Sequence, residues 1–250
     1  MRPLILAMTL LPLALATQSG PVPATESDPV LDAVRRYVAH WRSTLPDFIC
    51  QQSTLLFSGS HSDHIWHPTD NQQLELTVVN GREQYQLYQK DNRGPIPVGF
   101  PTINSRGEYA SALMVLFDPA SGTQFHRRGV YNEQNRSLRR YDFAVQQKNS
   151  QWYFGPGLGF APAYEGHIWI DEGDGSVHRL EMEAFRFPDK LFVNKASLRL
   201  EFALVVIAEL PRLMPSRAVL RVCNKGGRCE QNILEFSNYH KFVATSRLIN

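Results

Sequence analysis

Three carboxylates lie within four residues of this chain: Asp171, Glu172 and Asp174, in the segment Asp-Glu-Gly-Asp-Gly. Carboxylates that lie close together bind calcium or act as a catalytic acid–base pair. The spacing does not match the calcium loop D-x-[DN]-x-[DN]-G, and few other oxygen ligands lie nearby in the sequence. A third interpretation, the tip of a β-hairpin, depends on the residues on either side.

The residues that flank these acids have the alternation of a hairpin. Ile168 lies on an apolar face before the turn, and Leu180 lies on one after it. Because directly opposite residues of a sheet share a face, the connecting loop must hold an odd number of residues. A loop over residues 172–176 puts Ile168 opposite Leu180 and Trp169 opposite Arg179, a cation–π pair. The sequence therefore predicts that the acids occupy a hairpin tip.

A second cluster with metal-binding chemistry contains His61, His64 and His67. Imidazole is the commonest metal ligand in proteins. Steps of three residues bring ligands together on a helix, but this segment follows a strand and is flanked by Gly59 and Pro68. In a strand, His64 faces away from the other two imidazoles. The pattern favours a solvated hairpin turn and leaves a metal site as the alternative.

No catalytic motif is present in the sequence. It has neither the G-x-S-x-G elbow of α/β-hydrolases nor the H-E-x-x-H of zinc proteases, and no phosphate-binding glycine motif. We assign no catalytic residue and expect no cofactor.

The chain has three cysteines: Cys50, Cys223 and Cys229. The last two flank a turn-rich segment, and pairing them puts Ala218 opposite Leu234, so that the apolar faces agree. We predict a cross-strand disulfide between Cys223 and Cys229, which would stabilise the fold by about 2 kcal/mol. Zinc would need four ligands, and redox chemistry favours C-x-x-C spacing. Cys50 is predicted to be a buried structural thiol.

A glycine-rich segment, Gly-Pro-Gly-Leu-Gly at residues 155–159, is flanked by aromatic residues that include Trp152, Phe154 and Phe160. No helix follows that could hold a phosphate at its N-terminus. An aromatic loop of this kind could close as a lid over an apolar ligand. The alternative is a plain surface loop.

The first residues indicate export. One arginine, a short apolar run and the tripeptide Ala14-Leu15-Ala16 are typical of a secretory signal peptide over residues 1–16. The run is shorter than the roughly 20 residues of a membrane span, although an uncleaved anchor is the alternative. Residues 17–27 are predicted to be a flexible lead-in, and residues 28–250 a single domain. The protein is expected in the periplasm or outside the cell, with no transmembrane segment after cleavage.

The charge excludes one class of partner. The formal net charge is +2, and the arginine pairs are scattered along the chain. Nucleic-acid-binding domains concentrate basic residues on one face or stripe. We therefore expect no nucleic-acid partner.

Two helices are predicted. Asp28 followed by Pro29 is typical of a helix start, and Pro46 ends this helix. Ser105 and Glu108 form a capping box that begins a second, shorter helix. The first helix has an apolar stripe at steps of three and four residues, formed by Leu31, Val34, Val38, Trp41 and Leu45.

Most of the remaining chain alternates with a period of two. Asn80-Gly81 is a strong hairpin signal that puts Leu76 opposite Tyr85. We count roughly ten strands and no alternation of strands with helices, which indicates an antiparallel sheet. The predicted fold class is α+β, mostly β: one large antiparallel sheet with an apolar face covered by the two helices.

Two stretches resemble bacterial envelope proteins of the periplasmic lipoprotein-carrier superfamily, which includes lipoprotein carriers and related sigma-factor regulators. The matching positions are Tyr164, Gly166, Ile168–Asp171, Gly175, Val177, Arg179 and Glu181, and the final strand Glu235–Phe242. The order of elements is also similar: a leading helix, a long antiparallel sheet and a short helix inserted midway.

The resemblance implies an open half-barrel whose concave apolar face is covered by helices. It also implies a non-enzymatic protein that binds acyl chains or lipidated partners. No residue-level function carries over, because apolar character and not a motif defines the cavity of that superfamily. Candidates for cavity lining are Leu74, Leu76, Tyr85, Leu200, Phe202 and Leu204. The alternative for each is direct packing against the helices.

The sequence leaves three classes of function open. The first is an exported, periplasmic, non-enzymatic binding protein for a lipid, an acyl chain or a lipidated partner. The second is an envelope interaction or sensor module with a filled core and no ligand cavity. The third is a secreted hydrolase or a metal-dependent enzyme. Co-purifying acyl material, a specific protein partner and bound metal would distinguish them.

Overall fold

The computed structural model describes residues 28–60, 65–80, 82–91, 111–133, 135–154 and 159–242. The predicted signal peptide and lead-in therefore lie outside the described residues. None of the described helices is both long and apolar enough to cross a membrane.

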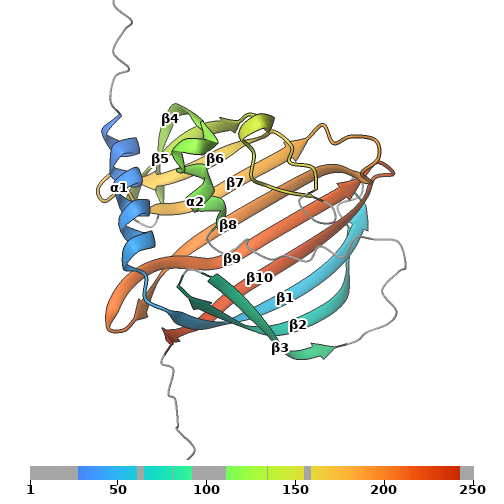
Figure 1. Cartoon of the computed structure of the whole chain (residues 1–250), viewed down its shortest axis with the longest axis horizontal. Helices are drawn as coiled ribbons and strands as arrows, with labels where there is room; N and C mark the ends of the chain where they lie inside the picture. The colour runs from blue at the N-terminus through green and yellow to red at the C-terminus, as the bar shows by residue number, and fades with distance from the viewer. Residues whose placement is uncertain are drawn as a thin grey trace, which may run out of the picture.

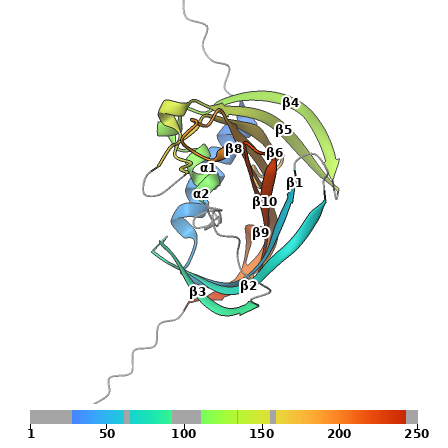
Figure 2. The same ribbon diagram turned by 90° about the vertical axis from the view of Figure 1, so that its right-hand side faces the viewer.

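The architecture is one sheet of ten antiparallel strands with two α-helices, so the predicted fold class is confirmed. The strand order is β3-β2-β1-β10-β9-β8-β7-β6-β5-β4, and the edge strands β3 and β4 do not pair, so the sheet stays open. Both helices lie on one side of it, within the curve of the outer strands (Figure 2). We call that side of the sheet the helix face and the opposite side the open face.

The bounds of the elements follow the chain. The helices are α1 (Pro29–Thr44) and α2 (Ser111–Leu116), with short 3-10 turns at Pro119–Ser121 and Gln147–Asn149. The strands are β1 (Phe48–Ser60), β2 (Trp66–Val79), β3 (Arg82–Asp91), β4 (Gln124–Glu133), β5 (Arg136–Val145), β6 (Tyr164–Asp171), β7 (Val177–Phe185), β8 (Val193–Ile207), β9 (Leu210–Asn224) and β10 (Arg228–Lys241).

Helix α1 forms as its sequence predicts. The Asp28 carboxylate accepts hydrogen bonds from the backbone N–H groups of Val30 (3.0 Å) and Leu31 (3.3 Å), which satisfies two donors that have no partner within the helix. Leu45 then turns to an extended conformation before Pro46. Four of the five predicted stripe residues are buried and Leu45 is partly buried, and α1 lies across one end of the strands (Figure 1).

Helix α2 is shorter than the sequence suggested. It spans six residues, and the predicted capping box at Ser105 lies outside the described residues. Leu113 and Leu116 are buried in the core. The side chains of Ser121 and Thr123 bond the Leu116 carbonyl and close the C-terminal end of this helix.

The predicted hairpin registers are confirmed. Leu76 lies opposite Tyr85, and Ile168 lies opposite Leu180. Five residues connect β6 to β7, and the Arg179 guanidinium lies 3.9 Å from the ring centroid of Trp169. Alternation and turn chemistry therefore sufficed to set these pairings.

The largest fully buried side chains lie between the helices and the helix face of the sheet, and they form one cluster. Such a cluster is the hydrophobic core of a single layered domain. Its largest members are Phe48, Leu76, Leu116, Tyr141, Ile168, Ile170, Leu180, Leu200, Ile207, Met214 and Leu234.

Candidate functional site: the apolar helix face

The helix face is apolar across most of the sheet. In cross-strand order, β7 to β10 contribute Leu180, Leu200, Ala218 and Leu234 to one row, each directly opposite the next. All four are buried. An apolar surface of this extent must be covered by other elements, since water contact with it is unfavourable.

The predicted cavity-lining residues divide into three groups. Leu76 and Leu200 have no exposed surface, and Phe202 is 8% exposed within the same cluster. Leu74 is partly buried, and Tyr85 packs at the edge of the core. A lining role for these five stays a prediction.

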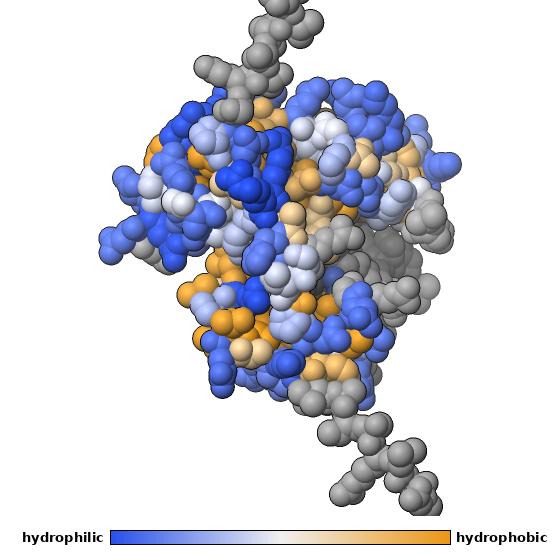
Figure 3. All heavy atoms as spheres, turned by 60° about the vertical axis from the view of Figure 1, so that its left-hand side comes forward, coloured by the Kyte–Doolittle hydropathy of each residue, from blue (hydrophilic) through white to orange (hydrophobic). Residues whose placement is uncertain are grey.

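Leu204 lies at the surface. It is 64% exposed, although strand alternation puts it on the same face as Leu200 and Phe202. The register between β8 and β9 shifts between Glu201 and Phe202, and such a bulge increases local twist. Beyond Phe202 the buried residue of β8 is Ile207, at an odd position, and Val205 packs against the core. Leu204 and Val206 therefore face solvent at this end of β8, and Figure 3 shows apolar surface on this side of the molecule, beside α1.

Side chains hold the N-terminal end of α1 on the sheet. The Tyr141 hydroxyl, from β5, donates to both oxygens of the Asp28 carboxylate at 2.9 and 2.8 Å. Burial, together with this bond to Asp28, raises the pKa of Tyr141. The residue that caps the helix therefore also fixes its position over β5.

The C-terminal end of α1 is held by β9. The Trp41 indole N–H donates to the carbonyl of Leu213 at 3.1 Å. The Arg212 guanidinium donates to the hydroxyl of Thr44 at 2.9 Å and to its carbonyl at 3.3 Å. Side-chain contacts at its two ends, together with its apolar stripe, therefore attach α1 to the sheet.

The acidic hairpin tip contacts the N-terminal half of α1. Gly175 has φ +74°, and a Cβ built on it would lie 2.8 Å from the carbonyl carbon of Ala33 and 2.9 Å from the backbone nitrogen of Val34. Only glycine combines this backbone conformation with such a close approach. Gly175 therefore allows the backbone of α1 to pack directly against this turn.

The acids of this tip have structural partners. Asp171 pairs with Arg136 at 3.1 Å and accepts from the Gly173 N–H at 2.8 Å. Glu172 accepts from the Ser137 hydroxyl at 2.6 Å and from Arg139 Nε at 2.9 Å, and these two bonds lower its pKa. The cluster thus ties the β6–β7 turn to β5 and shapes the turn.

The predicted lid residues belong to an aromatic cluster at the edge of the core. Phe154 and Phe160 exchange two backbone hydrogen bonds of 2.8 and 2.9 Å, and both rings pack against Phe187. Trp152 packs against Phe154 and edge-on against Tyr164. Residues 155–158 lie outside the described residues, and a lid function stays a prediction.

The helix face also carries polar side chains. Gln52 and Thr54 of β1 are buried, and the Gln52 amide donates to the Thr54 hydroxyl at 2.9 Å. On β10, Glu230 lies on the same face, and burial raises its pKa to about 6, against the opposing effect of Arg228. The helix face therefore includes polar positions among its apolar residues.

Replacing Glu230 by Gln is expected to increase stability at pH 7. Because the pKa of Glu230 is higher in the folded state, folding stability falls as pH rises from about 4.5 to about 6 and stays lower above that. The Glu230→Gln variant lacks this fall and gains on the order of 1 kcal/mol at pH 7. Urea unfolding at pH 4.5 and 7 measures it, with Glu235→Gln on the open face as the control. Equal stability of wild type and variant at both pH values would contradict it.

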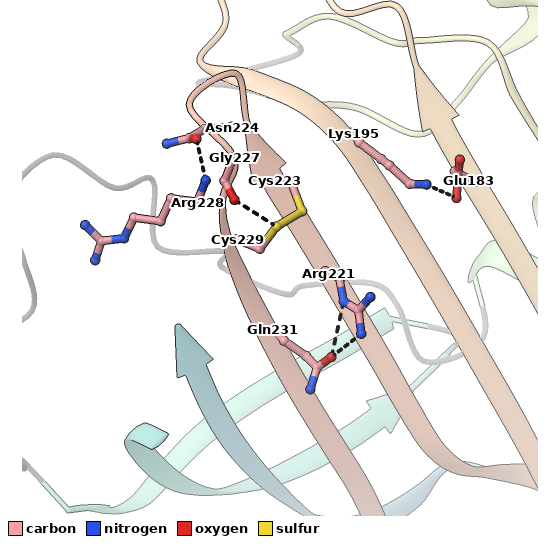
Figure 4. Close-up of a disulfide and its surroundings, with 9 residues drawn as sticks. All are labelled: Glu183, Lys195, Arg221, Cys223, Asn224, Gly227, Arg228, Cys229 and Gln231. Atoms are coloured by element: carbon pink, nitrogen blue, oxygen red, sulfur yellow. Dashed lines mark hydrogen bonds and ion pairs between the residues drawn. A yellow bond between two sulfur atoms is a disulfide. The ribbon is translucent and has the colours of Figure 1, made fainter. Parts of the chain in front are cut away.

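The predicted disulfide between Cys223 and Cys229 is confirmed, and both residues are buried. Figure 4 shows it at the end of the β9–β10 hairpin, near the hydrogen-bonded pair of Arg221 and Gln231. Cys50 is free and buried, and burial raises the pKa of its thiol to about 12, so it is a structural thiol.

Removing the disulfide should lower the free energy of unfolding. A double Cys223→Ser, Cys229→Ser variant is expected to lose about 2 kcal/mol, because the bond closes a short loop of the unfolded chain. Urea unfolding with and without dithiothreitol measures this loss. The reductant should destabilise the wild type and leave the variant unchanged. An oxidised wild type no more stable than the variant would argue against it.

The histidine cluster is only partly described. His67 lies on β2 and is exposed, and His61 and His64 lie outside the described residues. Within the described ranges no group of three or more His, Cys, Asp or Glu side chains is arranged to hold a metal ion.

A second concave site lies on the open face, and the search for catalytic motifs did not find it. A cavity of about 800 Å³ runs over β4 to β9, lined on one side by Asp142, Glu165 and Glu181 and on the other by Arg199 and Arg221. The signal was available in the polar residues that alternate with the core positions of these strands. Their signs become meaningful only once the strand order places them in rows.

At the acidic side of this cavity, Asp142 is fully partnered. It bonds Arg128 at 2.6 Å, Arg140 at 2.9 Å and His167 at 2.7 Å. Partial burial works to raise its pKa, but the three hydrogen bonds outweigh burial and hold the pKa at about 2. Asp142 therefore stays ionised and organises a network between β4, β5 and β6.

No family model matches the chain, and no curated protein matches it significantly. Among solved structures it is similar to a LolA superfamily protein from Nitrosomonas europaea, with 12% identity, 86% of this chain and 93% of that chain covered, and a TM-score of 0.35. A DUF1329 family protein from Desulfovibrio piger has 12% identity, 88% and 96% coverage and a TM-score of 0.43. A putative outer membrane lipoprotein-sorting protein domain from Vibrio parahaemolyticus has 11% identity, 84% and 90% coverage and a TM-score of 0.38.

One of these solved structures is described as a LolA superfamily protein and another as a lipoprotein-sorting protein domain, and the sequence pattern of this chain resembles that superfamily. At TM-scores below 0.5 these likenesses carry no argument about individual residues or function.

Proposed function

We propose that the protein is an exported, non-enzymatic binding protein that holds a lipid, an acyl chain or a lipidated partner against the helix face. One observation carries this proposal. The apolar row across β7–β10 belongs to one buried cluster that also includes Cys50 on β1 and Leu76 on β2, in a sheet that stays open at its edges. The signal-like first 16 residues support export.

The way in which the helix face is covered also supports the proposal. Helix α1 shares no backbone ladder with the sheet, and α2 has only six residues. A cover held by side chains at its ends can tilt without breaking the hydrogen bonds of the sheet. An acyl chain that slides beneath it would replace helix–sheet contacts by contacts of similar apolar character.

The polar positions of the helix face near the β9–β10 turn suit an amphiphile. Glu230 and the buried Asn232 lie there, on the same face of β10 as Leu234. A bound lipid would place its chain over the apolar rows and its polar group near these two side chains, since buried polar groups need hydrogen-bond partners.

The test is acyl binding by the exported protein. We expect native mass spectrometry to show acyl material bound to the purified full chain, and a fluorescent fatty acid to bind it saturably. Bare polypeptide in the spectrum and no saturable uptake of the probe would overturn the proposal.

A matched pair of variants locates the ligand. Ala196 is fully buried on the helix face, and Ala144 lies on the open face. Ala196→Leu adds volume on the helix face and is expected to lower uptake of the fatty acid, at a stability cost of about 1–3 kcal/mol. Ala144→Leu adds the same volume elsewhere and is expected to leave uptake unchanged.

A second candidate function, an envelope interaction module with a filled core, is supported by the complete burial of Leu76 and Leu200 in the core cluster. Such a protein binds its partner through its surface and takes up no acyl probe. Retention of one protein partner by the full chain, with the same occupancy in Ala196→Leu, would favour this function.

A further inference from the structure

The cavity on the open face is lined by acidic side chains on one side and by arginines on the other. Its cross-strand rows are set by the register: Glu165, Glu183, Ser197 and Arg221 are successive neighbours across β6 to β9. Adjacent strands lie about 4.8 Å apart, so the row reaches from carboxylates to a guanidinium over about 14 Å. A ligand in this cavity meets acids at one end and arginines at the other.

The acidic end is largely neutralised by the protein itself. Glu183 pairs with Lys195 at 2.7 Å, and Glu181 lies 3.5 Å from Arg199 and 3.8 Å from Arg179. Glu165 has no ion pair within the described residues, but it is exposed to solvent. This end of the cavity therefore has little unpaired negative charge with which to bind a cation.

The arginine end is different, because Arg221 has only a neutral partner. Its guanidinium donates two hydrogen bonds to the Gln231 side-chain oxygen, at 2.8 and 3.3 Å (Figure 4). The same group lies 4.8 Å from the ring centroid of Trp66. Across the described part of the chain, no carboxylate lies within ion-pair distance of Arg221. Stacking on Trp66 holds the planar group in place and leaves further N–H donors for a ligand.

Ser197 adds a hydroxyl to the cavity from the neighbouring strand β8. It lies directly opposite Arg221 and lines the same cavity, and its hydroxyl bonds no other described residue. Two donors from adjacent strands, one of them charged, match an oxyanion, which accepts a charge-assisted bond from arginine and a second from a hydroxyl.

The other two arginines contribute less. Arg199 is paired with Glu201 at 2.6 Å. Arg217 forms no ion pair with any described residue, but the register places it directly between Glu201 and Glu235, which offset its charge. The positive potential of this end therefore centres on Arg221.

We propose that Arg221 and Ser197 form an oxyanion-binding subsite on the open face, which takes a phosphate or carboxylate group. The ligand is either a free anion or the head group of an amphiphile. Val219 lies next to Arg221 on the same face of β9 and lines the cavity, so a short apolar body has a surface to contact. The subsite is separated from the helix face by the sheet itself and does not depend on acyl binding there.

The experiment measures binding of inorganic phosphate and of hexyl phosphate to the full chain by calorimetry. Arg221→Gln is expected to weaken both by about tenfold or more, since it removes a charged hydrogen bond. Arg221→Lys keeps the charge without the planar fork and is expected to fall in between. Ser197→Ala is expected to weaken both by about threefold, the effect of one neutral hydrogen bond.

Two controls separate a site from general charge effects. Arg217→Gln removes a cavity arginine whose charge is offset, and Arg35→Gln removes an exposed arginine of α1. Both are expected to change the affinity less than about twofold, because a specific site and not net charge decides binding. Equal affinity of wild type and Arg221→Gln, or failure of wild type to bind either probe at millimolar concentration, would overturn the proposal.

The two probes also distinguish the source of the anion. Tighter binding of hexyl phosphate supports an amphiphile head group, and equal binding of both supports a free anion; each outcome requires the loss in Arg221→Gln. Fatty-acid uptake by Arg221→Gln is expected to match that of wild type. Failure of this subsite is thus distinguishable from failure of the proposed function.

Discussion

Gly175→Ala is expected to lower the free energy of unfolding by about 3 kcal/mol, since a Cβ at φ +74° costs roughly 1–2 kcal/mol and its contact with α1 adds to this. The added atom would lie 2.8 Å from the backbone of Ala33. That neighbour is helix backbone, which cannot rotate away as a side chain can. The helix would therefore have to shift from the sheet.

The control for this prediction is Gly227→Ala. Gly227 has φ +80°, but nothing lies within 4 Å of the position of its Cβ. The control carries the backbone strain alone and is expected to cost about 1 kcal/mol. The difference between the two variants then reports the packing of α1 on the acidic hairpin tip.

Urea unfolding measures both variants, and hydrogen exchange of the α1 amides shows whether the helix loosens. We expect faster exchange in Gly175→Ala and unchanged exchange in Gly227→Ala. If both variants lost the same stability and the α1 amides stayed protected from exchange, Gly175 would be required by the turn conformation and not by the packing of α1.

Leu200→Ala is expected to be the other large effect, with a loss of about 2–5 kcal/mol. Leu200 is fully buried in the middle of the helix face, so truncation removes apolar contacts and leaves a cavity. Leu204→Ala is the matched control. It changes the same side chain on the same strand at 64% exposure and is expected to cost less than about 0.5 kcal/mol.

This pair of leucines also bears on the function. If Leu200 packs directly against its neighbours, its truncation has the full cost of a core residue. A loss below about 1 kcal/mol would indicate that Leu200 faces space that a ligand can fill, because truncation beside an existing void removes few contacts. The fluorescent fatty acid should then bind Leu200→Ala at least as well as wild type.

Local rules predicted much of this fold. Asp28 and Pro29 start α1, and Asn80 begins a hairpin, through interactions within a few residues of chain. The pairing of Cys223 with Cys229 followed from parity, because a register slip by one residue would move every side chain to the other face. These features need no knowledge of distant contacts.

The candidate sites were less predictable. The face of Leu204 could not be read from alternation, because the buried positions of β8 change from even to odd beyond its register shift with β9. The oxyanion subsite joins Ser197 and Arg221, which are distant in sequence and adjacent only through the register of β8 and β9. Neither residue is distinctive in its own segment.

The acidic segment Asp171–Gly175 shows which features are local in the sequence and which depend on the tertiary structure. The sequence by itself determined that residues 172–176 form a hairpin tip, because strand parity and turn chemistry are local. Only the tertiary structure decided that the acids bind Arg136 and Arg139 and that Gly175 seats α1. The physical reason is that the position of a helix over a sheet results from packing between segments far apart in the chain, which no local pattern encodes.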